Sequence, residues 1–251
     1  MIRRVLVPAM RRQDWAAVAI EVLVVIVGLY LGLQLNAWKE SRDARAREHA
    51  ALVRLQDESE EIVRYFRQQV DQAERDIEGQ EAALLALSAR DRTRYTAAEL
   101  GERLGTLDRY PGIAPPRAVY DELTGSGLMS DVGSTAVRTD IAAYYARLAY
   151  VQSQLDYFRL FRVMLQSKEL PGARSTFDPA HPRDIDRFVY SADFDAIVGD
   201  PRAMEQLIDG FRSQLVFLRY RTTVLERAEA MCTSLARTLG KRCESARAAT
   251  N

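Results

Sequence analysis

Histidine and cysteine are scarce in this chain, with two residues of each among 251. A metal site held by three histidines of one chain is therefore impossible, and only two residues are available as a histidine base. His181 lies in a proline-rich segment between Asp178 and Pro182, and His49 lies among charged residues. We expect both histidines to be incidental.

An excess of charge of either sign is also missing, because 35 Lys and Arg balance 35 Asp and Glu. Nucleic-acid binding relies on clustered cations that neutralise phosphates, and no basic block is present, which argues against nucleic acid as the main partner. Hydrophobic residues make up 47% and charged residues 28% of the chain. This composition excludes a disordered or collagen-like chain and allows a sizeable core.

Recognisable catalytic and cofactor motifs are missing as well. The sequence contains no G-x-S-x-G, Walker A, H-E-x-x-H, C-x-x-C or EF-hand pattern. Ser126 lies between Gly125 and Gly127 but lacks the preceding strand that a nucleophilic serine on a sharp turn requires, so we interpret it as a helix terminator. The sequence therefore predicts no catalytic residue, no cofactor and no metal, and it makes an enzyme the least favoured class.

One apolar run, from Trp15 to Leu35, contains a single charged residue, Glu21. A hydrocarbon core about 30 Å thick requires about 20 apolar residues at about 1.5 Å each. Trp15 and Trp38 flank the run, as aromatic anchors do at a membrane interface. We expect residues 15–37 to form one transmembrane helix embedded in a lipid bilayer.

A cleavable signal peptide is the alternative interpretation of this run. Its apolar region is usually about 7–15 residues long and is followed by a small-x-small cleavage site. The run here is longer, and only Leu35-Asn36-Ala37 resembles such a site. An uncleaved anchor is therefore favoured, and a buried helix of a soluble protein is less favoured still.

Basic residues flank the run in similar numbers, so the positive-inside count gives only a preference for orientation. Those before it face one acidic residue, Asp14, whereas those after it alternate with Glu40, Asp43 and Glu48. We expect residues 1–14 to form a short cytoplasmic tail in a bacterial inner membrane, with the bulk of the chain in the periplasm. The basic residues are Arg3, Arg4, Arg11 and Arg12 before the run, and Lys39, Arg42, Arg45 and Arg47 after it.

One face of the expected transmembrane helix carries Glu21, Gly28, Gly32 and Asn36, at spacings of seven and four residues. Two glycines four residues apart allow another helix to approach closely. A carboxylate within the membrane costs about 2–3 kcal/mol at the centre and less near the end. We therefore expect this face to be a helix–helix interface. The alternative is that Glu21 reaches water at the headgroups and the glycines are incidental.

The remainder of the chain is rich in apolar residues at helical spacing, which predicts an all-α fold. The transmembrane helix is expected to continue into a long helix that ends near residue 89. Shorter helices are expected at 96–107 and 117–124, and long ones at 135–168 and 201–240. Together they predict an elongated antiparallel bundle over residues 38–240, followed by a tail at 241–251. No strand pattern of useful length is visible.

Three sets of residues are expected to line the core of this bundle. The first helix contributes Leu52, Leu55, Ile62, Phe66, Val70, Ala73, Ile77, Leu84 and Leu87. The last contributes Met204, Leu207, Ile208, Phe211, Leu215, Leu218, Val224 and Leu225. Aromatic residues between them are expected in the core and along a groove, with a ligand pocket as the alternative: Tyr144, Tyr145, Tyr150, Tyr157, Phe158 and Phe161.

Cys232 and Cys243 leave two possibilities open. On one continuous helix their Cα atoms would lie about 16 Å apart, which is too far for a disulfide. Gly240 lies between them and is typical of a helix C-terminus, after which the chain can turn back. A disulfide is then possible and would suit an oxidising compartment. Two reduced thiols are equally compatible with the sequence.

The segment from Glu21 to Gly28, followed by Leu33-Gln34-Leu35-Asn36-Ala37-Trp38-Lys39-Glu40, resembles an uncharacterised bacterial family of single-pass membrane proteins. Family members are similar again at Val119 to Leu123, at Ser126-Gly127 and at Tyr144-Tyr145. The resemblance covers the anchor and about the first 150 residues. It implies a single-pass anchor and a helical domain, and no activity, because the family has none assigned.

This chain departs from the family pattern at three positions near the anchor. Ile20 stands where the family has glycine before the glutamate, and Ala37 and Lys39 replace polar residues after the apolar run. These differences leave the expected anchor intact and bear only on how its helix packs.

These observations favour a non-enzymatic, membrane-anchored scaffold or accessory subunit, with a second copy or another membrane protein as its partner. A different class, an extracytoplasmic sensor or ligand-binding module, is the alternative. A sensor would have to signal through a partner, because only 14 residues precede the apolar run. A pocket lined by Tyr144, Tyr150, Tyr157 and Arg159 would favour that alternative.

Overall fold

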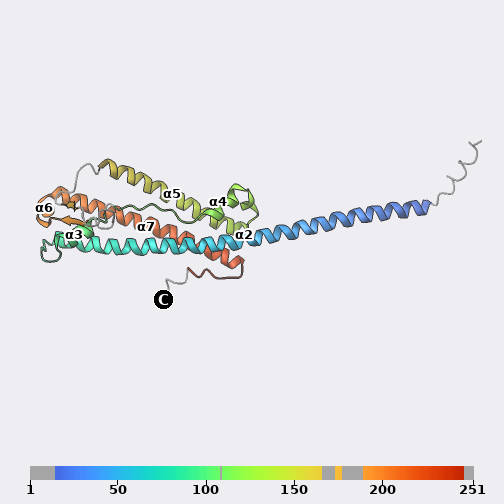
Figure 1. The fold of residues 1–251 in the computed structure, drawn as a ribbon, viewed down its shortest axis with the longest axis horizontal. Coiled ribbons are helices and arrows are strands. Elements are labelled where there is room, and N and C mark those ends of the chain that lie inside the picture. The colour runs from blue at the N-terminus through green and yellow to red at the C-terminus, as the bar shows by residue number, and fades with distance from the viewer. Residues whose placement is uncertain (1–14, 108, 166–172, 177–188, 246–251) are drawn as a thin grey trace, which may run out of the picture. The chain divides into compact units, whose positions relative to one another are not determined.

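The computed structural model describes residues 15–107, 109–165, 173–176 and 189–245 (Figure 1). Most of these residues are helical, which confirms the all-α prediction. The expected tail at 1–14, His181 and most of the segment around it lie outside the described residues.

The first described helix, α2 (Trp15–Ser88), is 74 residues long and contains the apolar run and the expected long helix without a break. The chain divides into two compact units, residues 1–51 and 52–251. The second unit begins at Leu52, inside the expected bundle at 38–240. Within the first unit, the described residues from Ile20 to Arg47 are all exposed.

The second unit is built on the part of α2 from Leu52 onward, together with α5 (Thr135–Leu165) and α7 (Pro201–Thr238). Figure 1 shows α5 and α7 running beside each other, as their contacts require. Every residue of the core stripe expected on α2 is buried. Phe66 on α2 meets Tyr144 on α5 edge to face, with ring centroids 6.5 Å apart.

Short helices close the two ends of this unit. At one end, α3 (Ala97–Leu104) and α6 (Phe194–Gly199) pack with α2 and α7 around Leu87, Leu100 and Leu207. At the other, α4 (Ala118–Gly125) is followed by the 3₁₀ helix η2 (Leu128–Asp131). The expected caps are present: Thr96 forms a capping box with Glu99, and Asp200 accepts a hydrogen bond from Arg202 N.

Two short strands, β1 (Ala173–Thr176) and β2 (Val189–Ala192), pair antiparallel, with Ala173 opposite Ala192 and Thr176 opposite Val189. No strand pattern of useful length was visible in the sequence. At four residues each, the strands are too short for an alternating pattern to be recognised. They leave the fold class unchanged.

The core stripe expected on α7 is partly wrong. Ile208 and Leu215 are 53% and 44% exposed, whereas Gln214 and Arg221 are buried. The buried stripe of α7 runs through Ala203, Leu207, Gly210, Gln214, Phe217, Arg221, Val224, Ala228, Met231 and Leu235. This stripe keeps the three- and four-residue spacing of a helix face, but hydrophobicity alone cannot reveal it because two of its members are polar.

Gln214 lies in the core, where it donates hydrogen bonds to backbone carbonyl groups of the chain after α3. Its side-chain Nε2 donates to the carbonyl oxygens of Leu107, Thr106 and Arg109 at 2.8, 3.3 and 3.2 Å. A buried amide with three carbonyl acceptors is well satisfied on its donor side. It fixes the segment after α3 against α7.

Candidate functional site

The face that carries Glu21, Gly28, Gly32 and Asn36 is exposed along the first unit. A Cβ atom added at either glycine would meet nothing within 4 Å, so no described part of the chain packs against this face. Asn36 Nδ2 donates to Glu40 Oε1 on the same helix at 2.9 Å. Among the described residues, α2 is the one helix that is long and apolar enough to cross a membrane, judged by length and composition.

Of the two tryptophans expected as interfacial anchors, the structure describes the side chain of Trp38 only. The indole ring of Trp38 is exposed, and the Arg42 guanidinium lies 5.7 Å from its centroid, one turn along α2. Such a cation–π pair combines an apolar ring with a charged group, as suits a membrane–water interface. The side chain of Trp15 lies outside the described part of the structure.

In the second unit, Glu58 on α2 holds the start of α4. Its carboxylate accepts hydrogen bonds from the backbone N–H groups of Val119 and Tyr120 at 2.7 and 3.2 Å. Arg117, at the N-cap position of α4, provides no side-chain cap. Glu58 therefore caps α4 from a distant part of the chain, and its negative charge lies where a helix N-terminus favours it.

Aromatic stacking and a salt bridge complete the attachment of α4. The Tyr120 ring stacks on that of Tyr145, with centroids 3.5 Å apart and planes 18° apart, and Tyr145 Oη donates to Glu58 at 3.3 Å. Burial, followed by the charge of Glu58, raises the pKa of Tyr145 far above its ordinary value, so this hydroxyl stays a donor. Outside this buried group, Arg54 on α2 pairs with Glu122 of α4.

The Arg54–Glu122 pair predicts a local response to acid. The Arg54 guanidinium hydrogen-bonds Glu122 and holds the pKa of that carboxyl below its ordinary value. Its stabilising effect is therefore complete above the ordinary carboxyl pKa and is lost as the pH falls through the lowered one. We expect amide exchange in α4 to be slower in the wild type than in Glu122→Gln at neutral pH, and equal in acid. A difference that persists at low pH would contradict this.

Two residues further along α2, Glu60 holds the segment that follows α7. Residues two apart on a helix point to different sides, so Glu58 and Glu60 hold different parts of the chain. Glu60 accepts hydrogen bonds from the backbone N–H groups of Glu244 and Ser245, both at 2.7 Å, and from the Ser245 hydroxyl. Each carboxylate thus binds two consecutive backbone N–H groups.

Cys232 and Cys243 form a disulfide beside Glu60, with Cα atoms 5.7 Å apart. The chain turns back after α7 at Gly240, whose φ of +66° is readily adopted by glycine. Gln56 Nε2 donates both to Glu60 Oε1 at 3.1 Å and to Cys232 Sγ at 3.5 Å. A carboxylate oxygen of Glu60 and the two sulfurs lie within 4.8 Å of one another. Because the sulfurs are bonded to each other, they are unavailable as thiolate ligands for a metal.

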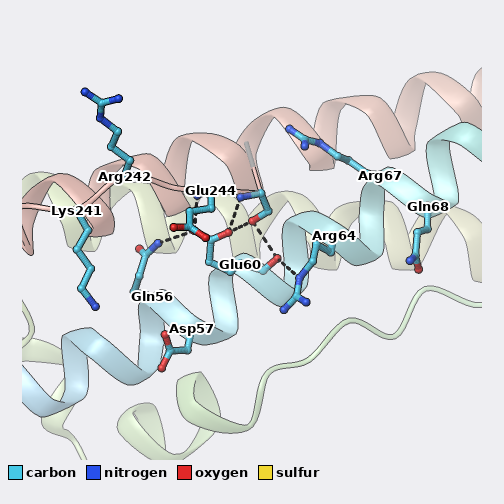
Figure 2. Close-up of a pocket in the computed structure, with 10 residues that line it drawn as sticks. Gln56, Asp57, Glu60, Arg64, Arg67, Gln68, Lys241, Arg242 and Glu244 are labelled. Carbon is cyan, nitrogen blue, oxygen red and sulfur yellow. Dashed lines mark hydrogen bonds between the residues drawn. The ribbon is translucent and has the colours of Figure 1, made fainter. Parts of the chain in front are cut away.

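A groove of about 910 Å³ lies along α2 beside this segment (Figure 2). Its charged groups do not converge on one point, because Lys241 and Arg242 extend to opposite sides in Figure 2. Arg67 is paired with Glu229 at 2.6 Å. The lining is mixed in charge: Gln56, Asp57, Glu60, Arg64, Arg67, Gln68, Lys241, Arg242, Glu244 and Ser245.

The tyrosines expected to line a ligand pocket differ widely in how far they are buried. Tyr144 is fully buried, whereas Tyr150 and Tyr157 are 46% and 62% exposed. Tyr144 and Tyr145 therefore lie in the core, whereas Tyr150 and Tyr157 lie at the surface of α5. Arg159 Nε donates to the carbonyl oxygen of Tyr110 at 3.0 Å and holds a loop.

Several residues that organise the second unit gave no signal in the sequence. Glu58 and Glu60 are two of many carboxylates on α2, and only the fold shows which of them meet backbone N–H groups. Arg221 is 5% exposed, and its Nε makes no hydrogen bond within the described residues. Burial lowers the pKa of Arg221.

Comparison with protein-family models, curated proteins and solved structures finds no match for this chain.

Proposed function

We propose that this protein is a non-enzymatic, membrane-anchored scaffold or accessory subunit that acts through helix–helix association of the apolar part of α2. The supporting observation is the face of Glu21, Gly28 and Gly32, which no described part of the chain covers. Without a second helix, the carboxylate would face lipid and the glycines would leave backbone uncovered. A partner helix would pack against the glycines and offer Glu21 a hydrogen-bonding group.

The proposed location is a bacterial inner membrane, crossed once, with a cytoplasmic N-terminus and a periplasmic bundle. The length and apolar character of α2 between Trp15 and Leu35 support the anchor. The Cys232–Cys243 disulfide supports a bundle that folds in an oxidising compartment, since cytosolic thiols are normally kept reduced. Labelling with a membrane-impermeant reagent at a cysteine placed in the bundle tests the orientation.

Substitution of the glycine face is expected to weaken association in the membrane. Gly28→Leu places a large side chain where close approach is needed, and Glu21→Leu removes the polar contact. Each change should lower the yield of crosslinked complex about tenfold, which corresponds to about 1.4 kcal/mol. The control is Leu23→Phe, which enlarges a side chain on the opposite face. The measurement is in-membrane crosslinking with affinity purification of the tagged full chain.

The identity of the crosslinked partner separates the two forms of the proposal. A specific second protein that is lost in Gly28→Leu and Glu21→Leu would make this chain an accessory subunit of that protein. Self-crosslinks that are lost in the same variants would make it a homo-oligomeric scaffold. Crosslinking that is equal in all variants and the control would refute association through this face.

A further inference from the structure

The residues that follow α7, Leu239 to Ser245, form what we term the C-terminal strap. Its first part leaves α7 through a tight turn, in which Lys241 N donates to the Ala236 carbonyl at 2.7 Å. Its far end is tied to α2, since Glu60 accepts both the Glu244 and Ser245 N–H groups at 2.7 Å. Figure 2 shows the strap crossing over Glu60 and forming one wall of the groove.

Few described contacts besides these hold the strap. Lys241, Arg242 and Glu244 are exposed, and the buried strap residues are Cys243, in the disulfide, and Ser245, on Glu60. No carboxylate of the described residues forms an ion pair with Lys241 or Arg242. Among the described contacts, attachment of the strap to the bundle therefore depends on one covalent bond and on hydrogen bonds to Glu60.

We propose that the C-terminal strap is a redox-sensitive latch, which a dithiol reductant releases from α2 while the bundle stays folded. Release would uncover Glu60 and Gln56 along the groove. In the latched state the Glu60 carboxylate accepts hydrogen bonds from two consecutive backbone N–H groups of the strap. Once freed, the same carboxylate could accept two such bonds from an extended segment of another polypeptide.

The chemistry is a thiol–disulfide exchange. A thiolate of the dithiol attacks Sγ of Cys243, which is the less buried of the two cysteines at 6% exposure, and Cys232 leaves as a thiolate. Gln56 Nε2, 3.5 Å from Cys232 Sγ, is placed to donate a hydrogen bond to that leaving group. The second thiol of the reductant then displaces Cys243. Cys232 and Cys243 each take up a proton, and the dithiol is oxidised to its own disulfide by loss of two electrons.

Release is expected to stay local because the strap contributes little to the core. The bundle is held by stripes of α2, α5 and α7 centred on residues such as Phe66, Tyr144 and Phe217, all at most 1% exposed. The disulfide joins cysteines that are eleven positions apart, at the end of α7 and in the strap, so it restricts the strap far more than the rest of the bundle. Segments with few buried contacts open locally at a lower free energy than the core.

The test is amide hydrogen exchange of the full chain in detergent micelles, before and after treatment with dithiothreitol. Reduction should speed exchange at the Glu244 and Ser245 amides by about 100-fold, which is the order of the loop-closure effect of a disulfide that spans so few residues. Exchange of α2 amides from 62 to 77 should change less than about twofold. Unchanged exchange at Glu244 and Ser245 would overturn the proposal, as would loss of protection throughout the bundle.

Single substitutions separate the contribution of the disulfide from that of Glu60. Cys243→Ser should show the reduced pattern without dithiothreitol and no further response to it. Glu60→Gln should speed strap exchange in the oxidised protein while the disulfide stays formed, and Glu61→Gln, a change at an exposed neighbour, should not. Strap exchange in Cys243→Ser equal to that of the oxidised wild type would show that the disulfide does not hold the strap.

Discussion

Glu58→Leu is expected to lower the free energy of unfolding of the bundle by about 2–4 kcal/mol. The substitution leaves the N–H groups of Val119 and Tyr120 without an acceptor and removes the acceptor of Tyr145 Oη. A buried donor left unpaired costs about 1–3 kcal/mol, and partial exposure of α4 to water lowers the sum. Denaturant unfolding of the full chain in detergent, followed by circular dichroism, measures the loss.

Asp57→Leu is the matched control, because Asp57 is the exposed neighbour of Glu58 on the same helix. Hydrogen exchange adds a local readout, since the amides of Val119 and Tyr120 should lose protection in Glu58→Leu and keep it in Asp57→Leu. Equal stability of the two variants would show that Glu58 does not hold α4.

Arg221→Met is expected to act in the opposite direction and to raise the free energy of unfolding by about 1–3 kcal/mol. Arg221 is 5% exposed, and no described carboxylate forms an ion pair with it. Burying a cation without a hydrogen-bonded partner costs several kcal/mol, and methionine has a similar shape without the charge. The lowered pKa of Arg221 has the same cause, which is desolvation.

The control for Arg221→Met is Arg219→Met, at an exposed position two residues earlier on α7. This change should alter stability by less than about 0.5 kcal/mol, as surface substitutions usually do. A loss of stability in Arg221→Met that is absent from the control would show that the Arg221 charge contributes a favourable contact.

The architecture was largely predictable because it follows from patterns along single helices. The period of Leu52, Ile62 and Phe66 revealed a buried face, and Thr96 and Asp200 marked helix starts through local capping chemistry. Such signals depend only on residues within one or two helical turns of each other, so they can be recognised from the sequence alone.

The attachments between segments were not predictable, for a physical reason. Glu58 and Val119 lie 61 residues apart, and Glu60 and Glu244 lie 184 apart. Nothing near a glutamate on a charged helix indicates that it will meet backbone N–H groups of a distant segment. Gln214 and Arg221 were missed in a related way, because a polar residue in a buried stripe looks like part of a solvated face.

The disulfide illustrates an intermediate case. The positions of Cys232, Gly240 and Cys243 permitted a bridge only if the chain turned back after the last helix, and they equally permitted two thiols. The turn at Gly240 and the hydrogen bonds from the strap to Glu60 bring the two cysteines together. The second of these contacts involves α2 and had no sequence signature.

The most direct test of the proposed association is a crosslinking scan along the apolar part of α2. A photoreactive residue is placed at each position from 20 to 36 of the full chain in membranes, and the yield of crosslinked complex is measured. Maxima at positions 21, 28 and 32, with the 3.6-residue period of a helix face, are the expected result. A yield that is flat along the segment, or that peaks on the face of Leu23 and Tyr30, would contradict association through the glycine face.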